Sequence, residues 1–406
     1  GAGFVPAVID PKPIEDLSAI RFLGAELAAK HPVVKTWQVP PPSLADPEVP
    51  ILAEGIYDPR REMRFANAIP VLQGYKNQAG VGYSVNFEDP LRFTNLEVTA
   101  AFTDAANKDE RGHGAIKYRY LGWNAAVSWN RSDFYDLFGP TKRSRRGYAA
   151  SVGNEYALIF DEPRRLDVKG EVAYYGKLDT LPDFQNISAP VDRLLTAQVG
   201  LYYSHVRSSL GSVDDEKGVT WAIVASANHA HGQTIPQLRG DFDFGVPIFP
   251  HSSVWLRNSA GTSHGDRDDP LAQFFFGGFG NNYVDSRSIK RFHEYYSMPG
   301  FGLNEIGGSS YARSLAEWNL PPVIFESVGT PSFYLTWLRP TLFAAGLWTD
   351  PGRQELRQRF ESVGAQVDLR FTMLHWYNMT LSFGYGVGYR GRARAGDEWM
   401  ISLKIM

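Results

Sequence analysis

The clearest catalytic pattern in the chain is Gly261-Thr262-Ser263-His264-Gly265, which matches the G-x-S-x-G signature of serine hydrolases. In that signature the serine occupies a sharp turn between a strand and a helix. Here the following residues are Asp266-Arg267-Asp268-Asp269-Pro270, a composition typical of a loop. Because short patterns recur by chance, we favour a glycine-rich strand end. A hydrolase that uses Ser263 and His264 is kept as an alternative.

Two groups of residues resemble metal-binding patterns but lack part of a ligand set. His229 and His231 would share one face of a strand, but no carboxylate is adjacent, which indicates a polar turn. Asp266, Asp268 and Asp269 lack the Gly and Glu of an EF-hand loop, which indicates a solvated loop. The absence of cysteine excludes thiolate ligands, disulfides and a cysteine nucleophile. We therefore predict no metal, no cofactor and no enzyme activity.

The remaining charged residues point to surfaces rather than to catalysis. Lys142, Arg143, Arg145 and Arg146 form a basic cluster at a predicted strand start. Outside a membrane this cluster would meet lipopolysaccharide phosphates, and the alternatives are a solvated rim or charges in a lumen. The net charge of −3 gives no reason to expect nucleic-acid binding. Other charges fall on the polar faces of predicted strands, where they would line a barrel lumen: Glu97, Lys117, Arg119, Glu171 and Arg390.

The elements that carry these residues are long alternating segments, which begin near Arg64. In the clearest one, apolar residues occupy every odd position from Tyr377 to Tyr389, and polar residues or glycine occupy the even ones. This period of two predicts a strand with one wet face. Several segments exceed ten residues, as a membrane-crossing strand requires, whereas strands of soluble proteins average five or six. No stretch approaches the roughly 18 apolar residues of a membrane helix.

Aromatic residues near strand ends, such as Tyr156, Trp348 and Trp376, suit the interfacial girdle of a membrane barrel. A soluble all-β binding protein is the alternative. We predict sixteen strands, eleven before and five after a long Gly-rich stretch. Counting Leu271–Phe279 as a strand would give an odd number of strands, whereas bacterial single-chain barrels have an even number. We therefore assign this stretch to the loop. The predicted strands are residues 64–74, 79–87, 92–105, 110–121, 124–132, 146–161, 165–178, 191–207, 216–228, 234–249, 253–264, 307–320, 331–350, 357–373, 376–391 and 395–406.

Residues 1–55 differ from the rest of the chain. Ile14, Leu17, Ile20, Leu23 and Leu27 recur at helical spacing, which predicts an amphipathic helix packed on its own protein, with a membrane-surface helix as the alternative. A Pro-rich linker follows over residues 40–50. The start at Gly1 suggests a processed or partial product. We predict two parts: residues 1–55 as the tail of an upstream domain or a plug, and residues 56–406 as the barrel.

The layout resembles the bacterial surface antigen family, the barrels of Bam-type outer-membrane insertases and translocases. Gly277-Gly278 is similar to the family's Gly-Gly at the base of the sixth loop. Gly307-Gly308, followed by residues 316–322 (AEWNLPP), is similar to its twelfth strand, and residues 343–346 (FAAG) stand where the thirteenth carries Phe-x-Asp-x-Gly. Some barrels of this type follow a TolB-like propeller, and residues 1–55 would then be the tail of such a domain.

This chain departs from the family in two linked places. Residues 282–285 (NYVD) replace the family's Arg-Gly motif, and the acidic partner on the thirteenth strand is replaced by alanine. The two members of an ion pair are expected to be lost together, because a single buried charge without its partner is costly. The resemblance therefore suggests Arg291 and Phe292 as a substitute anchor, with Glu317 or Glu305 as the partner of Arg291.

The resemblance implies an all-β fold: a 16-stranded antiparallel transmembrane β-barrel in the outer membrane. Its long sixth extracellular loop would fold into the lumen, and a short helical and Pro-rich segment would precede it. The implied function is transport, export or protein assembly across the outer membrane. The alternative is a plugged barrel that anchors a larger envelope complex. The implied partners are outer-membrane lipid, lipopolysaccharide, other envelope proteins and an upstream periplasmic domain.

Overall fold

The computed structural model describes residues 25–33, 55–105, 107–184 and 186–405. The chain divides into two units, Gly1–Tyr57 and Asp58–Met406. In the first unit, residues 25–30 are helical and Leu27 is exposed. The rest of the predicted amphipathic helix and the Pro-rich linker lie outside the described residues. Within the described ranges, no helix is long and apolar enough to cross a membrane.

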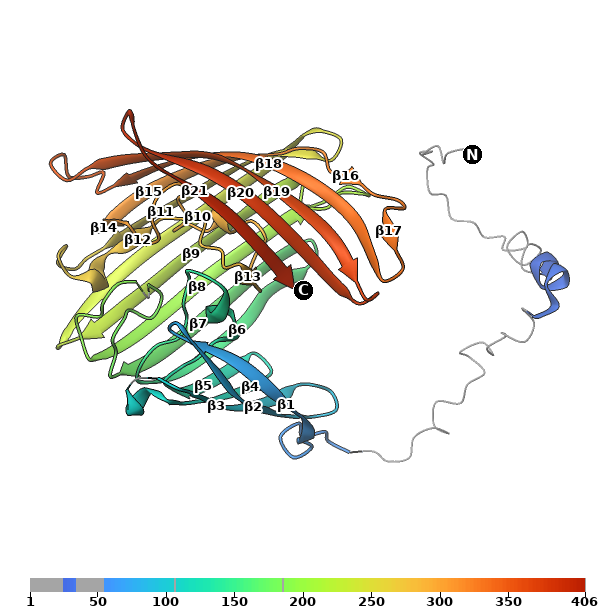
Figure 1. Cartoon of the computed structure of the whole chain (residues 1–406), viewed down its shortest axis with the longest axis horizontal. Helices are drawn as coiled ribbons and strands as arrows, with labels where there is room; N and C mark the ends of the chain where they lie inside the picture. Colours follow the sequence, from blue (N-terminus) through green and yellow to red (C-terminus); the bar gives the residue numbers. More distant parts are fainter. Residues whose placement is uncertain (1–24, 34–54, 106, 185, 406) are drawn as a thin grey trace. The chain divides into compact units, whose positions relative to one another are not determined.

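The second unit is built on one large curved antiparallel sheet (Figure 1). The sheet has 19 strands. Three of them, β13 (Val284–Asp285), β16 (Val323–Ile324) and β17 (Gly329–Thr330), have two residues each, which leaves sixteen long strands that pair in chain order. Each long strand lies on a predicted segment, within a few residues at either end. The all-β class is therefore confirmed.

The long strands are β1 (Arg64–Tyr75), β2 (Gln78–Glu88), β3 (Thr94–Thr103), β4 (Gly112–Tyr120), β5 (Trp123–Trp129), β6 (Tyr148–Asp161), β7 (Arg164–Gly176), β8 (Arg193–Arg207), β9 (Lys217–Ala230), β10 (Gln233–Phe249), β11 (Ser252–Ser263), β15 (Ser310–Asn319), β18 (Phe333–Thr349), β19 (Gln358–Met373), β20 (Tyr377–Arg390) and β21 (Ala393–Ile405). Short 3₁₀ turns lie between them: η3 (Lys108–Glu110), η4 (Phe134–Phe138), η5 (Pro270–Ala272) and η6 (Arg291–His293).

The two ends of the sheet are not joined to each other. Among the described residues, no ladder pairs β1 with β21. Instead, Val284 and Asp285 of β13 pair in parallel with Leu403 and Lys404 of β21. A closed sixteen-stranded barrel therefore stays a prediction.

The stretch that parity assigned to the loop contains a short strand outside the main sheet. β12 (Phe274–Phe276) pairs with β14 (Ile306–Gly308) in a separate two-stranded sheet. Assigning it wholly to loop was thus wrong in detail, as was starting the next long strand at Gly307, because Gly307 and Gly308 pair with β12. In the part of the chain that the structure describes, β12 pairs with β14 alone.

The polarity of the long strands is the reverse of that in a soluble protein. Apolar side chains such as Val152, Val199 and Phe242 point outward, and Phe242 is 50% exposed. Buried positions on the inward face include the ionisable residues Arg339 and Asp368. A sheet in water would bury the first set and expose the second. The alternation predicted from the sequence is therefore present, with its apolar side facing outward.

Candidate functional site

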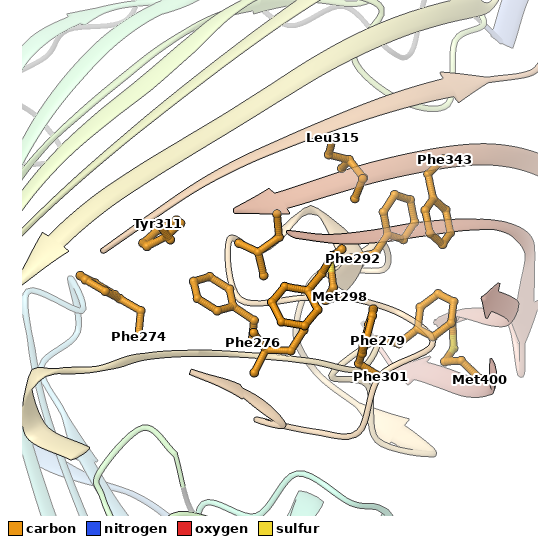
Figure 2. Packing of buried hydrophobic residues seen from close by; sticks show 14 residues of the cluster. Phe274, Phe276, Phe279, Phe292, Met298, Phe301, Tyr311, Leu315, Phe343 and Met400 are labelled. Atoms are coloured by element: carbon orange, nitrogen blue, oxygen red, sulfur yellow. The ribbon is translucent and has the colours of Figure 1, made fainter. Parts of the chain in front are cut away.

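Residues 265–306, called the inner segment below, pack against the inward face of the sheet. Figure 2 shows Phe276, Phe279, Phe292 and Phe301 of this segment among strand residues such as Phe343. Phe276, Phe279 and Phe292 are at most 1% exposed. Burial of each such ring stabilises the docked segment by about 1.5–3 kcal/mol.

The glycine row of β20 explains how the inner segment approaches so closely. A Cβ atom on Gly386 would lie 2.6 Å from Pro299 Cβ, and one on Gly388 would lie 2.6 Å from the ring of Phe301. The even positions of this strand were predicted to form its wet face, and they instead form a groove that receives the segment. Small residues are needed there because the segment occupies the space of their side chains.

Gly277 and Gly278 form backbone hydrogen bonds within the inner segment. Both have positive φ angles, +146° and +69°, which glycine adopts without strain. The N–H of Gly277 donates to Tyr296 O at 2.9 Å, and Gly278 exchanges two hydrogen bonds of 3.0 Å with Met298. A Cβ atom on Gly277 would lie 1.9 Å from Gly302 O. These two glycines therefore permit a turn within the inner segment.

Arg291 has a different partner from those suggested by the resemblance. Its Nη1 lies 2.9 Å from Asp285 Oδ2 and its Nη2 donates to the Tyr296 hydroxyl at 3.0 Å, so neither Glu317 nor Glu305 is paired with it. Burial opposes ionisation of Asp285. The backbone N–H of Arg287 and the charge of Arg291 outweigh burial and hold the pKa of Asp285 below its usual value. This pair stabilises the segment internally.

Phe292 makes the contact with the strands that was expected of an anchor. Its ring stacks on Phe343 of β18, with centroids 4.5 Å apart and an interplanar angle of 20°. Arg313 of β15 donates to Phe292 O at 2.8 Å and to Ser297 O at 3.1 Å. An aromatic stack and a buried guanidinium bound to carbonyl groups thus join the segment to the sheet beside Ala344-Ala345.

Glu317 on β15 is the centre of a buried charge network that joins the segment to the sheet. Its side chain is 0% exposed. Oε2 accepts from Arg257 Nε at 3.0 Å, and Oε1 accepts from Lys290 Nζ at 3.3 Å. Its other neighbour is His293, whose Nε2 lies 2.5 Å from Oε2, off the line of a regular hydrogen bond. The partners from the segment are therefore the residues that flank Arg291-Phe292.

Second partners balance the charges around Glu317. Arg257 also pairs with Asp243 at 2.8 Å, and Lys290 with Asp214 at 2.7 Å. Burial, and then the charge of Arg257, lowers the pKa of His293 to about 4, so His293 is neutral at pH 7. The network at neutral pH thus holds one buried carboxylate between two cations and a neutral imidazole.

Five contact residues were missed by the sequence reasoning: Arg257, Lys290, His293, Arg313 and Glu398. Glu398 of β21 accepts from the N–H of Phe279 at 3.1 Å and of Gly300 at 3.2 Å. A signal was present for Arg313, because it shares one face of its strand with Glu317. The others lie on segments distant in sequence, and only the fold brings them together.

The serine motif does not form a nucleophile elbow. β11 ends at Ser263, and the next regular element is the three-residue turn η5 rather than a helix. Ser263 Oγ is buried with no hydrogen-bond partner among the described residues, so His264 does not activate it. This geometry supplies no support for the hydrolase alternative.

The other candidate groups form local contacts. His229 Nδ1 lies 2.8 Å from Thr234 Oγ1, and Asp266 and Asp269 accept from backbone N–H groups within their own loop. No set of three or more His, Cys, Asp or Glu side chains is placed to hold a metal ion in the part of the chain that the structure describes. Among the predicted lumen charges, Lys117 pairs with Glu97 across two strands at 3.0 Å.

The basic cluster divides between paired and inward-facing residues. Arg143 lies 3.4 Å from Asp133, and Arg146 lies 4.0 Å from Glu110. Lys142 Nζ donates to a backbone carbonyl at 2.5 Å. Arg145 is 7% exposed and lines a cavity of about 720 Å³. The lumen alternative therefore describes Arg145 better than the lipopolysaccharide one.

Comparisons with known proteins gave structural neighbours only. No protein-family model matches the sequence, and no curated protein matches it. CdiB from Escherichia coli superposes with a TM-score of 0.45 at 16% identity, covering 86% of this chain and 62% of that one. CdiB from Acinetobacter baumannii gives 0.39 and 13%, covering 83% and 58%. BamA from Haemophilus ducreyi lacking POTRA domains 1–3 gives 0.43 and 10%, covering 84% and 69%.

The chain spans about three fifths of the length of the two CdiB proteins.

Proposed function

We propose that this chain is an outer-membrane β-barrel of sixteen strands that acts in transport, export or protein assembly across that membrane, with the inner segment as a sixth loop folded into the lumen. The observation that supports this most directly is the polarity of the long strands. An apolar outward face and an inward face that carries Glu317 and Arg339 suit hydrocarbon outside and a polar lumen inside. The proposal assigns no covalent chemistry.

Among the described residues, β1 has no partner on its outer edge and β21 has only β13 there, which favours protein assembly within this set of functions. An unpaired strand edge presents N–H and C=O groups that can template an added strand. In hydrocarbon such groups must be paired. β1 would therefore pair with β21, or each edge would pair with a strand of a substrate protein. β13 covers only two residues of the β21 edge.

Reconstitution tests the proposal. The protein should require detergent for solubility and should insert into liposomes. Deleting residues 268–304 should raise liposome conductance, because it removes the segment that fills the inward face. A monodisperse protein in buffer without detergent would contradict the outer-membrane location.

A plugged structural anchor is the second candidate, favoured by the number of independent ties to the inner segment. Glu317, Arg313 and Glu398 each bind it from a different position on the sheet. An anchor would hold an envelope partner or an upstream periplasmic domain, and its outer surface would contact lipid and lipopolysaccharide. If liposomes that carry the deletion variant remain non-conducting, the anchor is favoured.

A further inference from the structure

The cavity of about 720 Å³ on the inward face is strongly basic. It lies between the inward faces of β7–β10, the inner segment and the β5–β6 connection. Seven of its lining residues are Arg or Lys and two are acidic, Glu171 and Asp183, although the chain as a whole carries a net charge of −3. Positive charge is therefore concentrated at this place in the fold.

Three of the lining guanidinium groups have no acidic partner. Arg239 pairs with Asp241 at 3.1 Å, and Arg143 and Arg291 have the partners given above. By contrast, no described carboxylate lies within 4.0 Å of Arg131, Arg145 or Arg287. Burial, and then the charge of Arg131, lower the pKa of Arg145, while Tyr175 and the charge of Asp183 act in the opposite direction. The cations of this cavity thus repel one another.

Arg145 shows most clearly that a ligand belongs here. It is 7% exposed, and its Nη2 donates to Pro182 O at 2.6 Å while its plane lies over the Tyr175 ring at 5.2 Å. Its Nε and Nη1 are buried without any partner among the described residues. Buried polar groups in proteins are nearly always hydrogen-bonded, and a buried charge needs a counter-charge. The Nε–H group and the Nη1 amino group lie on different edges of the guanidinium, so each can donate to a separate oxygen of an anion.

We propose that this cavity is a binding site for a multiply charged phosphate compound, with Arg145 as its central ligand and Arg131 and Arg287 as flanking cations. Arginine is preferred to lysine where planar, bidentate recognition of phosphate is needed. A cavity of this volume falls within the range that holds small organic ligands. The site does not depend on what the barrel transports or assembles.

The test is calorimetric titration of the full chain in detergent micelles with inorganic pyrophosphate at low ionic strength. We expect saturable binding, and a dissociation constant raised at least about tenfold in Arg145→Gln. The matched control is Arg164→Gln, at an exposed turn where Arg164 pairs only with Asp161, and it should bind as the wild type does. Absence of saturable binding to the wild type, or equal affinity in Arg145→Gln, would overturn the proposal.

A second variant keeps the test decisive if Arg145→Gln fails to fold. Arg287 lies on an exposed part of the inner segment, so Arg287→Gln should fold and should weaken pyrophosphate binding several-fold; unchanged binding there would count against the site.

Nanodiscs with and without lipopolysaccharide then identify the source of the phosphate. Competition by lipopolysaccharide would indicate a lipid headgroup, and an unchanged affinity would indicate a free solute. The titration needs no conductance, so its failure is distinct from failure of the proposed function.

Discussion

Replacing Glu317 with Gln should release the inner segment from the sheet. The change keeps the size of the side chain and removes its charge, which leaves Arg257 and Lys290 facing a neutral amide. Breaking a buried ion pair by removing one partner costs about 3–5 kcal/mol. Since Arg257 keeps Asp243 and Lys290 keeps Asp214, we expect the lower end, about 3 kcal/mol.

This energy should appear as a change in the population of the released segment. At 1.4 kcal/mol for each factor of ten, 3 kcal/mol corresponds to about a hundredfold increase. Limited trypsin digestion after Arg291, which is 2% exposed in the docked segment, measures that population when opening and closing are faster than cleavage. Single-channel conductance in planar bilayers provides a second reading.

Glu305→Gln is the matched control. Glu305 was the other carboxylate suggested as an anchor, but it is 47% exposed and lies 3.9 Å from Arg390. An exposed pair contributes about 0–1 kcal/mol, so cleavage should rise less than about fivefold. If Glu317→Gln is cleaved no faster than Glu305→Gln, the buried network does not hold the segment and the reasoning is refuted.

Three further changes test other parts of the structure. Phe242→Arg, on the outward face, should destabilise the inserted protein by about 2–4 kcal/mol in urea unfolding from liposomes, and no loss would show that this face does not contact lipid. Gly386→Val should displace Pro299 and speed trypsin cleavage of the inner segment, whereas Gly114→Val, where a Cβ meets nothing within 4 Å, should not; equal cleavage would exclude the groove. The pKa of His293 is lowered to about 4 when the segment is docked, so the released state binds more protons than the docked state between pH 6.5 and pH 4. Docking should therefore weaken on acidification through that window, by on the order of 3 kcal/mol. A His293→Asn variant that kept this pH dependence would contradict the assignment to His293.

The sequence by itself determined the strands and their outward faces. Alternation from Tyr377 to Tyr389 specifies a strand with an apolar side because side chains on a strand have a period of two. The same local rule placed all sixteen long segments, since it needs only neighbours in the chain. Glu317 and Gly277-Gly278 were identified through the family resemblance of the sequence and not by this rule.

Only the tertiary structure decided what each of these residues contacts. Arg291 was a reasonable partner for Glu317 by charge, yet Asp285 lies nearer to it and Lys290 and His293 reach Glu317. These positions depend on how residues 265–306 fold back over the sheet, which no local pattern encodes.

The glycines of β20 and Arg145 show the same division. Gly386 reads in the sequence as part of a wet face, and in the fold it makes room for Pro299. In the sequence Arg145 is one of four similar cations, and in the fold it is the buried member of the four. Periodicity fixes which way a side chain points, because that is a property of the backbone. Its partner is fixed by long-range packing, in which segments far apart in the chain compete for the same buried charge and the same space.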